Sequence, residues 1–105
     1  MNITERHIPL IERCFNLKLY EHQKLYLLDK GTLESGRRTG KTFAYCIKLA
    51  LSDGEPLNMR KPEDFADERR LANHRRYAMS YFRHEFILIR NTLKESGFRV
   101  RELIQ

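Results

Sequence analysis

The chain has 105 residues, of which 41% are hydrophobic and 32% are charged, and this length and composition predict one folded domain with a modest core. No apolar stretch reaches the ~18 residues of a membrane span, and the first residues lack the basic and apolar regions of a secretion signal. The net charge of +6 favours polyanionic partners, either nucleic acid or an acidic protein surface.

The first thirty residues carry two helical patterns. Apolar residues recur at helical spacing between about residues 4 and 15, where Pro9 suits the first turn of a helix rather than its interior. A second helix is predicted from about residue 20 to residue 30. Gly31 follows it, and glycine commonly takes the left-handed conformation that ends a helix.

The middle of the chain predicts a strand, a loop and a third helix. Residues 32–34 favour a short strand, and residues 35–40 favour a glycine-containing loop. A helix is predicted from Lys41 to about Ser52, and the Asp-Gly-Glu-Pro sequence that follows stops it. Residues 57–61 are interpreted as a loop.

A long basic helix is predicted within residues 62–96, beginning at about residue 63. Proline and acidic residues suit its first turn, and Gly97 suits its end. Residues 98–101 alternate in polarity and predict a short terminal strand or a frayed end. An apolar stripe with the 3–4 spacing of a core-facing helix runs along the long helix and consists of Leu71, Ala78, Phe82, Phe86, Ile89 and Leu93.

These elements predict a single domain over residues 1–105. Its fold class is mainly α, with a minimal strand–loop–helix unit at residues 17–52. Cys14 and Cys46 lie in apolar helical patterns, so we expect buried thiols in the reducing cytoplasm of the host cell rather than a disulfide. The four histidines lack the spacing of a metal site.

The loop before the third helix carries a phosphate-binding pattern. Ser-Gly-Arg-Arg-Thr-Gly-Lys-Thr matches the last three positions of the Walker A pattern Gly-x-x-x-x-Gly-Lys-Ser/Thr, with serine in place of the first glycine. Small residues let backbone N–H groups wrap phosphate oxygens, and the helix N-terminus adds affinity for anions. Lys41 is expected to reach the β- and γ-phosphates, and Thr42 to hold Mg²⁺. The predicted nucleotide-binding residues of this loop are Ser35, Gly36, Arg37, Arg38, Thr39, Gly40, Lys41 and Thr42.

Residues 17–51 resemble the N-terminal part of a phage terminase large subunit, the ATPase that packages DNA, and of related helicase-like P-loop ATPases. Besides the loop, Leu-Tyr-Glu-His-Gln at residues 19–23 matches the adenine-reading motif of those families. The resemblance implies that Gln23 contacts adenine, that Arg37 and Arg38 sense the γ-phosphate, and that Mg-ATP is the ligand. A Gln amide can donate to and accept from the adenine edge at once. The alternatives are an ordinary helical glutamine and, for the loop, a basic turn between two helices.

A complete ATPase of this class also needs a Walker B strand that ends in Asp, usually followed by Glu. Two apolar runs come close, at residues 26–29 and 86–89, but both have helical patterns, and Arg90 and Asn91 follow the second. The resemblance covers about a third of the chain. The sequence therefore predicts a truncated or repurposed relative that binds nucleotide and has no ATPase activity in isolation.

Arginines recur every seven residues along the long helix. Because seven residues are nearly two helical turns, their side chains line one side of the helix, opposite the apolar stripe. We expect this arginine stripe to be exposed and to bind a nucleic-acid backbone or an acidic groove, since guanidinium groups bind phosphate and carboxylate bidentately. The alternative is a solvated helix face. The arginine stripe consists of Arg69, Arg76, Arg83 and Arg90, and Lys94 lies on the same side.

Two functions are compatible with these features. The first is a small phage-type P-loop protein that binds ATP or other phosphate groups in a DNA-transaction context similar to packaging. The alternative is a non-enzymatic basic helical protein that grips nucleic acid or an acidic protein groove, such as a phage inhibitor of a host CRISPR effector.

Overall fold

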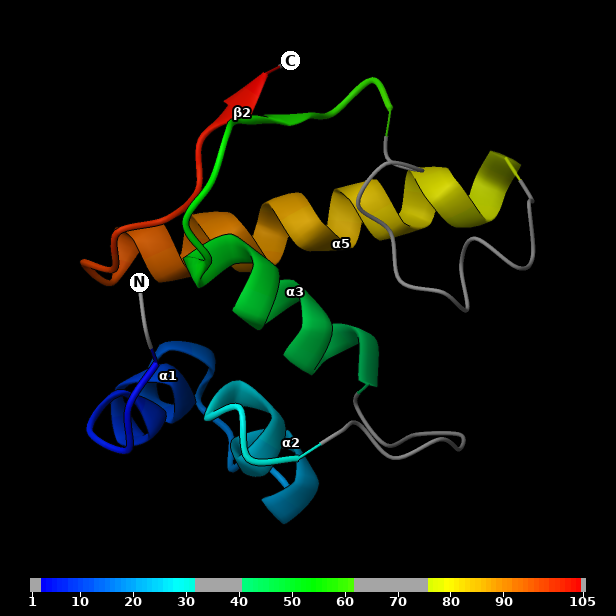
Figure 1. The fold of residues 1–105 in the computed structure, drawn as a ribbon. Helices are drawn as coiled ribbons and strands as arrows, with labels where there is room; N and C mark the ends of the chain where they lie inside the picture. The colour runs from blue at the N-terminus through cyan, green and yellow to red at the C-terminus, as the bar shows by residue number, and fades with distance from the viewer. Residues whose placement is uncertain (1–2, 32–40, 62–75, 105) are drawn as a thin grey trace.

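The computed structural model describes residues 3–31, 41–61 and 76–104 (Figure 1). Over these residues the fold is mainly helical, as predicted. The elements in chain order are α1 (His7–Phe15), α2 (Glu21–Leu27), α3 (Lys41–Leu51), β1 (Leu57–Asn58), α5 (Arg76–Glu95) and β2 (Leu103–Ile104). The predicted strand at residues 32–34 and the first part of the long helix, at residues 62–75, lie outside the described residues.

Both N-terminal helices end at a residue with left-handed backbone geometry. Asn16 has φ 52° after α1, and Leu17 N–H donates to the Glu12 carbonyl at 3.1 Å. After α2, Asp29 has φ 60° and Lys30 N–H donates to the Leu25 carbonyl at 2.8 Å. Asparagine and aspartate tolerate this geometry better than most residues. The second helix is therefore shorter than predicted, and Asp29 rather than Gly31 ends it.

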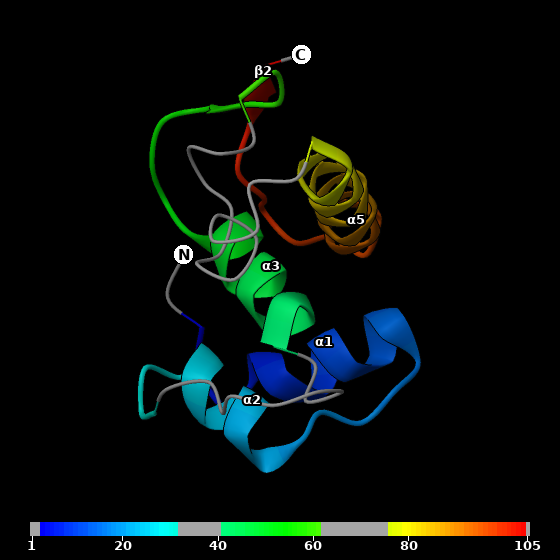
Figure 2. The ribbon, with the colours of Figure 1, turned by 90° about the vertical axis from the view of Figure 1, so that its right-hand side faces the viewer.

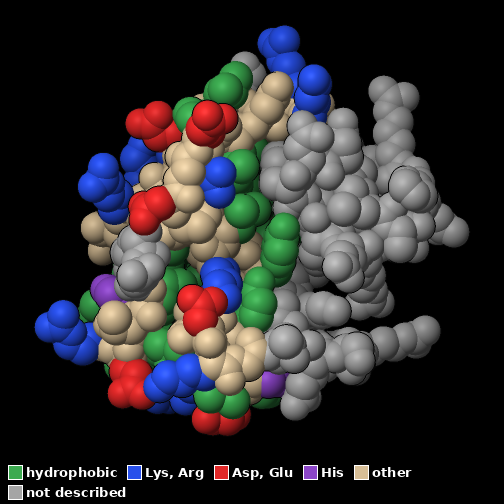
Figure 3. Space-filling model, in the orientation of Figure 1, with side chains coloured by type: hydrophobic (Ala, Val, Ile, Leu, Met, Phe, Trp, Pro, Cys, Tyr) green, Lys and Arg blue, Asp and Glu red, His purple; other side chains and the backbone are tan. Residues whose placement is uncertain are grey.

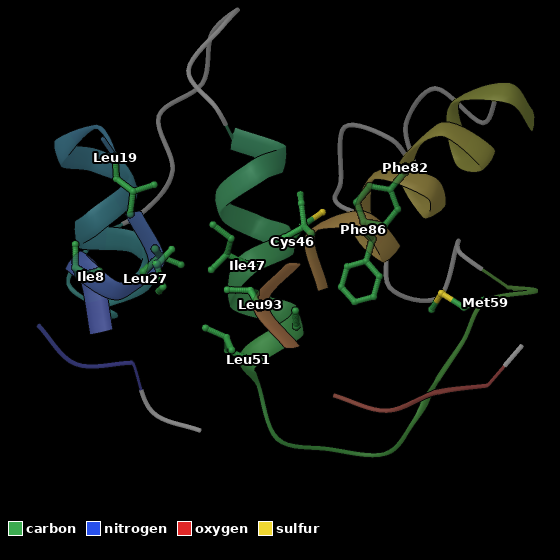
Figure 4. Packing of buried hydrophobic residues seen from close by; sticks show 13 residues of the cluster. Ile8, Leu19, Leu27, Cys46, Ile47, Leu51, Met59, Phe82, Phe86 and Leu93 are labelled. Atoms are coloured by element: carbon green, nitrogen blue, oxygen red, sulfur yellow. The ribbon is translucent and has the colours of Figure 1, made fainter. Parts of the chain in front are cut away.

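Helix α3 lies in the middle of the molecule, between α5 and the pair α1 and α2 (Figure 2). Cys46, Ile47 and Leu51 are fully buried on this helix. In Figure 4, Ile47 and Leu51 point toward Leu27 of α2, whereas Cys46 lies on the side of Phe86. Because α3 packs on both sides, it carries more buried positions than a surface helix does.

Helix α5 covers the other side of α3 with the apolar stripe predicted from its sequence. Phe82, Phe86 and Leu93 are fully buried, and Ile89 is 6% exposed. The rings of Phe82 and Phe86 lie 6.4 Å apart at an interplanar angle of 11°. The described part of the stripe is therefore confirmed as the core-facing side of the long helix.

The two strands form a parallel pair that the sequence did not predict. Leu57 pairs with Leu103 and Asn58 with Ile104, so β1, α5 and β2 make a β–α–β unit. The predicted loop at residues 57–61 was wrong at its first two residues. For residues 98–101 the sequence left a short strand or a frayed end open, and the structure has no strand there, since β2 begins at Leu103.

The segment before β2 is fixed to the end of α3 by Arg101. Its backbone N–H donates to the Ala50 carbonyl at 2.8 Å, and its side chain donates to the Glu55 carbonyl at 2.9 Å and to Ser52 Oγ at 3.0 Å. The last carbonyls of a helix have no partner within the helix, so the bond to Ala50 satisfies a group that α3 leaves open. Arg101 therefore holds this segment against the end of α3, and the chain pairs with β1 only after Arg101.

Lys48 joins α3 to the end of α2. Its Nζ donates to the Tyr26 carbonyl at 3.0 Å, pairs with the Asp29 carboxylate, and lies 4.3 Å from the centroid of the Tyr26 ring. This contact holds the turn in which Asp29 adopts its left-handed geometry. The residues that lead from α2 toward Lys41 leave from this turn.

We expect Lys48→Met to lower the free energy of unfolding by about 1–2 kcal/mol, because it removes a charged hydrogen bond and a cation–π contact while keeping the apolar stem. Urea denaturation followed by circular dichroism measures the change. Lys30→Met is the matched control, since Lys30 pairs with Glu5 at 3.5 Å on an exposed surface and such pairs contribute about 0–1 kcal/mol. Equal losses in the two variants would contradict the role assigned to Lys48.

Candidate phosphate-binding site

The predicted phosphate-binding loop leads into α3, and the structure describes the point where it joins. Helix α3 begins at Lys41, so Lys41 and Thr42 occupy its first turn. This is the position that the Walker A pattern assigns to its Lys-Thr pair. The other loop residues, Ser35, Gly36, Arg37, Arg38, Thr39 and Gly40, lie outside the described residues.

Two helix ends lie on one side of the molecule, the right-hand side in Figure 1. They are the N-terminal ends of α3 and α5, and Figure 2 shows both turned toward the viewer. The start of α3, where the Walker A pattern places its Lys-Thr pair, therefore lies on the same side of the fold as the start of α5.

Gln23, the predicted adenine contact, lies at the first turn of α2 and is only 4% exposed. The side-chain Oε1 of Gln23 accepts a hydrogen bond from Tyr20 N–H at 2.7 Å, and the backbone N–H of Gln23 donates to the Tyr20 carbonyl at 3.0 Å. The side chain thus satisfies a backbone group that the start of a helix leaves without a partner. The structure gives Gln23 a structural role, while the adenine contact remains a prediction.

The arginine stripe differs from the prediction of a fully exposed row. Arg90 is half-buried, and its Nε donates to the Arg101 carbonyl at 3.0 Å, because the chain returns along this side of α5 on its way to β2. Arg83 is exposed, and its Nη1 donates to the Met59 carbonyl at 3.3 Å. Lys94 is exposed. Arg76 is the first residue of α5, and Arg69 lies outside the described residues.

Arg60, which sequence analysis left out of the site, joins Arg83 and the neighbouring His84 at the surface. Arg60, which follows β1, and His84 are both exposed. With Arg83 they line a depression of about 400 Å³ whose remaining described walls are Met59 and Ile87. The sequence signal for a turn next to Arg60 was Asn58, a residue that favours turns. Only the fold shows that this turn contacts α5.

Neither apolar run that came close to a Walker B strand is a strand. Residues 86–89 lie within α5, and the run at residues 26–29 spans the end of α2 and its turn. Over residues 3–31, 41–61 and 76–104, no group of three His, Cys, Asp or Glu side chains is placed to hold a metal ion. In the same residues, no helix is both long enough and apolar enough to cross a membrane.

No family model, curated protein or solved structure matches the chain. The likeness of residues 17–51 to terminases therefore rests on the residues themselves and stays a prediction.

Proposed function

We propose that the chain binds ATP, or another ligand with adjacent phosphate groups, at the start of α3. The observation that supports this most strongly is the residue at which α3 begins. The glycine-containing sequence ends where α3 begins, at Lys41, which is the position that a Walker A sequence gives to its lysine.

The physical basis of the proposal is the backbone at the start of α3. The first N–H groups of a helix have no carbonyl partner within it and carry a partial positive charge. A phosphate accepts hydrogen bonds from them without a side-chain rearrangement, and the lysine of a Walker A sequence adds a full charge. In this proposal Lys41 contacts the outer phosphates and Thr42 coordinates Mg²⁺.

The proposed setting is a DNA transaction similar to packaging, with the chain acting as a nucleotide-binding part rather than a motor. Hydrolysis requires an acid that holds Mg²⁺ and a group that polarises water. Since both runs nearest to a Walker B pattern lie outside strands, we do not extend the proposal to hydrolysis by the chain alone.

A thermal-shift experiment tests the class of ligand. We expect Mg-ATP to raise Tm by about 10 °C, because a ligand present at 100 times its Kd stabilises the fold by about 2.7 kcal/mol. Adenosine with the same Mg²⁺ concentration should leave Tm unchanged, since the proposed contacts are to phosphates. An equal shift with adenosine, or no shift with Mg-ATP, would contradict phosphate binding.

The alternative is a non-enzymatic protein that uses the basic side of α5 to grip nucleic acid or an acidic groove, as a phage inhibitor of a CRISPR effector does. The exposure of Arg83 and Lys94 favours it. This function requires no nucleotide, so substitution of Lys41 would leave it intact.

A further inference from the structure

The residue that opens the turn after β1 also fixes its shape. Asn58 Oδ1 accepts a hydrogen bond from Arg60 N–H at 2.9 Å, and the Asn58 carbonyl accepts one from Lys61 N–H at 3.1 Å. Met59 is 4% exposed, and its N–H donates to the Ile104 carbonyl at 2.8 Å. With Met59 anchored in the core, Arg60 is held at the surface.

Helix α5 brings a second guanidinium group to this turn. Arg83 donates from Nη1 to the Met59 carbonyl at 3.3 Å. Since a guanidinium carries five N–H donors in a fixed fork, this bond orients the group and leaves most of its donors for another acceptor. His84, the next residue, adds a ring nitrogen to the same rim.

The described rim of this depression is basic. None of its described lining residues is acidic. The ion pairs between described residues join Lys30 to Glu5 and Lys48 to Asp29, and neither involves the rim. In Figure 3, Lys and Arg side chains project at the upper edge of the molecule, over the segment that follows β1, while the Asp and Glu side chains of the described residues on this face lie lower and farther left. Like charges gathered by described residues that include no carboxylate favour an external anion.

We propose that the depression formed by Arg60, Arg83 and His84 binds a phosphodiester group of a nucleic-acid strand. Two arginines and an imidazole suit phosphate oxygens, which accept paired guanidinium bonds. The half-buried Ile87 and the edge of Met59 give the depression an apolar wall against which a sugar or base packs.

This site is separate from the nucleotide site proposed at Lys41 and does not depend on it. The two proposals fail independently: Lys41→Ala should leave nucleic-acid binding unchanged, and substitutions at the depression should leave the Mg-ATP shift unchanged.

Fluorescence anisotropy with a labelled single-stranded oligonucleotide of about 20 nucleotides, at about 50 mM and 200 mM salt, tests the inference. We expect Arg60→Gln with Arg83→Gln to weaken binding about ten-fold or more, and to flatten the slope of log K against log salt by about 1.4, because each phosphate contact on a single strand contributes about 0.7. Arg60→Gln alone should weaken binding about three-fold. Only the backbone N–H of Arg60 is hydrogen-bonded within the described part of the chain, so that variant separates lost binding from lost folding.

Arg6→Gln with Arg13→Gln is the matched control, because it removes the same charge from exposed positions at the two ends of α1. We expect it to weaken binding less than about two-fold. Equal weakening by the two pairs would overturn the site, since net charge alone would then explain binding. Unchanged binding in Arg60→Gln with Arg83→Gln, no binding by the wild type, or displacement of the oligonucleotide by poly-glutamate of equal charge would overturn it as well.

Discussion

Replacement of Phe86 by alanine is expected to lower the free energy of unfolding by about 3–5 kcal/mol. Phe86 is fully buried between α5 and α3, and its ring packs 6.4 Å from that of Phe82. Removal of the ring loses the burial of a large apolar group and leaves a cavity that the neighbouring helices only partly fill. Domains of this size have about 5–15 kcal/mol of stability in total, so the loss is a large fraction.

Thermal unfolding followed by circular dichroism measures this effect, with an expected decrease in Tm of about 10–30 °C. Leu88→Ala is the matched control on the same helix, because Leu88 is 54% exposed and lies outside the core. Its effect should stay within about 0.5 kcal/mol. Comparable losses in both variants would mean that α5 does not pack on α3 through the side described here.

The helices that build the core could be predicted because their signal is local. The spacing of Phe82, Phe86, Ile89 and Leu93 fixes which side of α5 is buried, whatever that side contacts. The start of α3 at Lys41 was likewise predicted, since the glycine-containing sequence before it disfavours helix and the residues after it do not. Both features depend on residues within a few turns of one another.

The sheet could not be predicted because its pairing is not local. The two-residue strands at Leu57 and Leu103 are too short to show alternation, and they meet only because α5 carries the chain back along the molecule. The same return of the chain along α5 explains why Arg90 is half-buried. Seven-residue spacing places Arg90 on the same side of α5 as Arg83. Only the fold shows that Arg90 donates a hydrogen bond to the Arg101 carbonyl.

The candidate site likewise has one part that a local pattern predicted and another that depends on the fold. Lys41 and Thr42 followed from a contiguous pattern, and their position at the first turn of α3 agrees with it. Arg60 was not identified, since it belongs to no motif and its proximity to His84 depends on the contact between Arg83 and the Met59 carbonyl. Seven-residue spacing could find a row of charge but not a depression between two elements.

Lys41→Ala is expected to weaken binding of Mg-ATP by about 10–100-fold, because a charged hydrogen bond to a phosphate contributes about 1.5–3 kcal/mol. The helix N-terminus and the remaining loop residues stay in place, so residual weak binding is expected. Since Lys41 lies in the first turn of α3 rather than in its middle, we expect the fold to tolerate the change.

Calorimetric titration of Mg-ATP into the wild type, Lys41→Ala and Lys94→Ala compares the two lysines directly. Lys94 is exposed in the last turn of α5, and its substitution removes the same charge from another part of the surface. If the anion is held where α3 begins, the wild type and Lys94→Ala will give the same saturable heat, and Lys41→Ala will need about 10–100 times more nucleotide. The three titrations would contradict a phosphate site at α3 if they superimposed, or if the wild type gave no heat of binding.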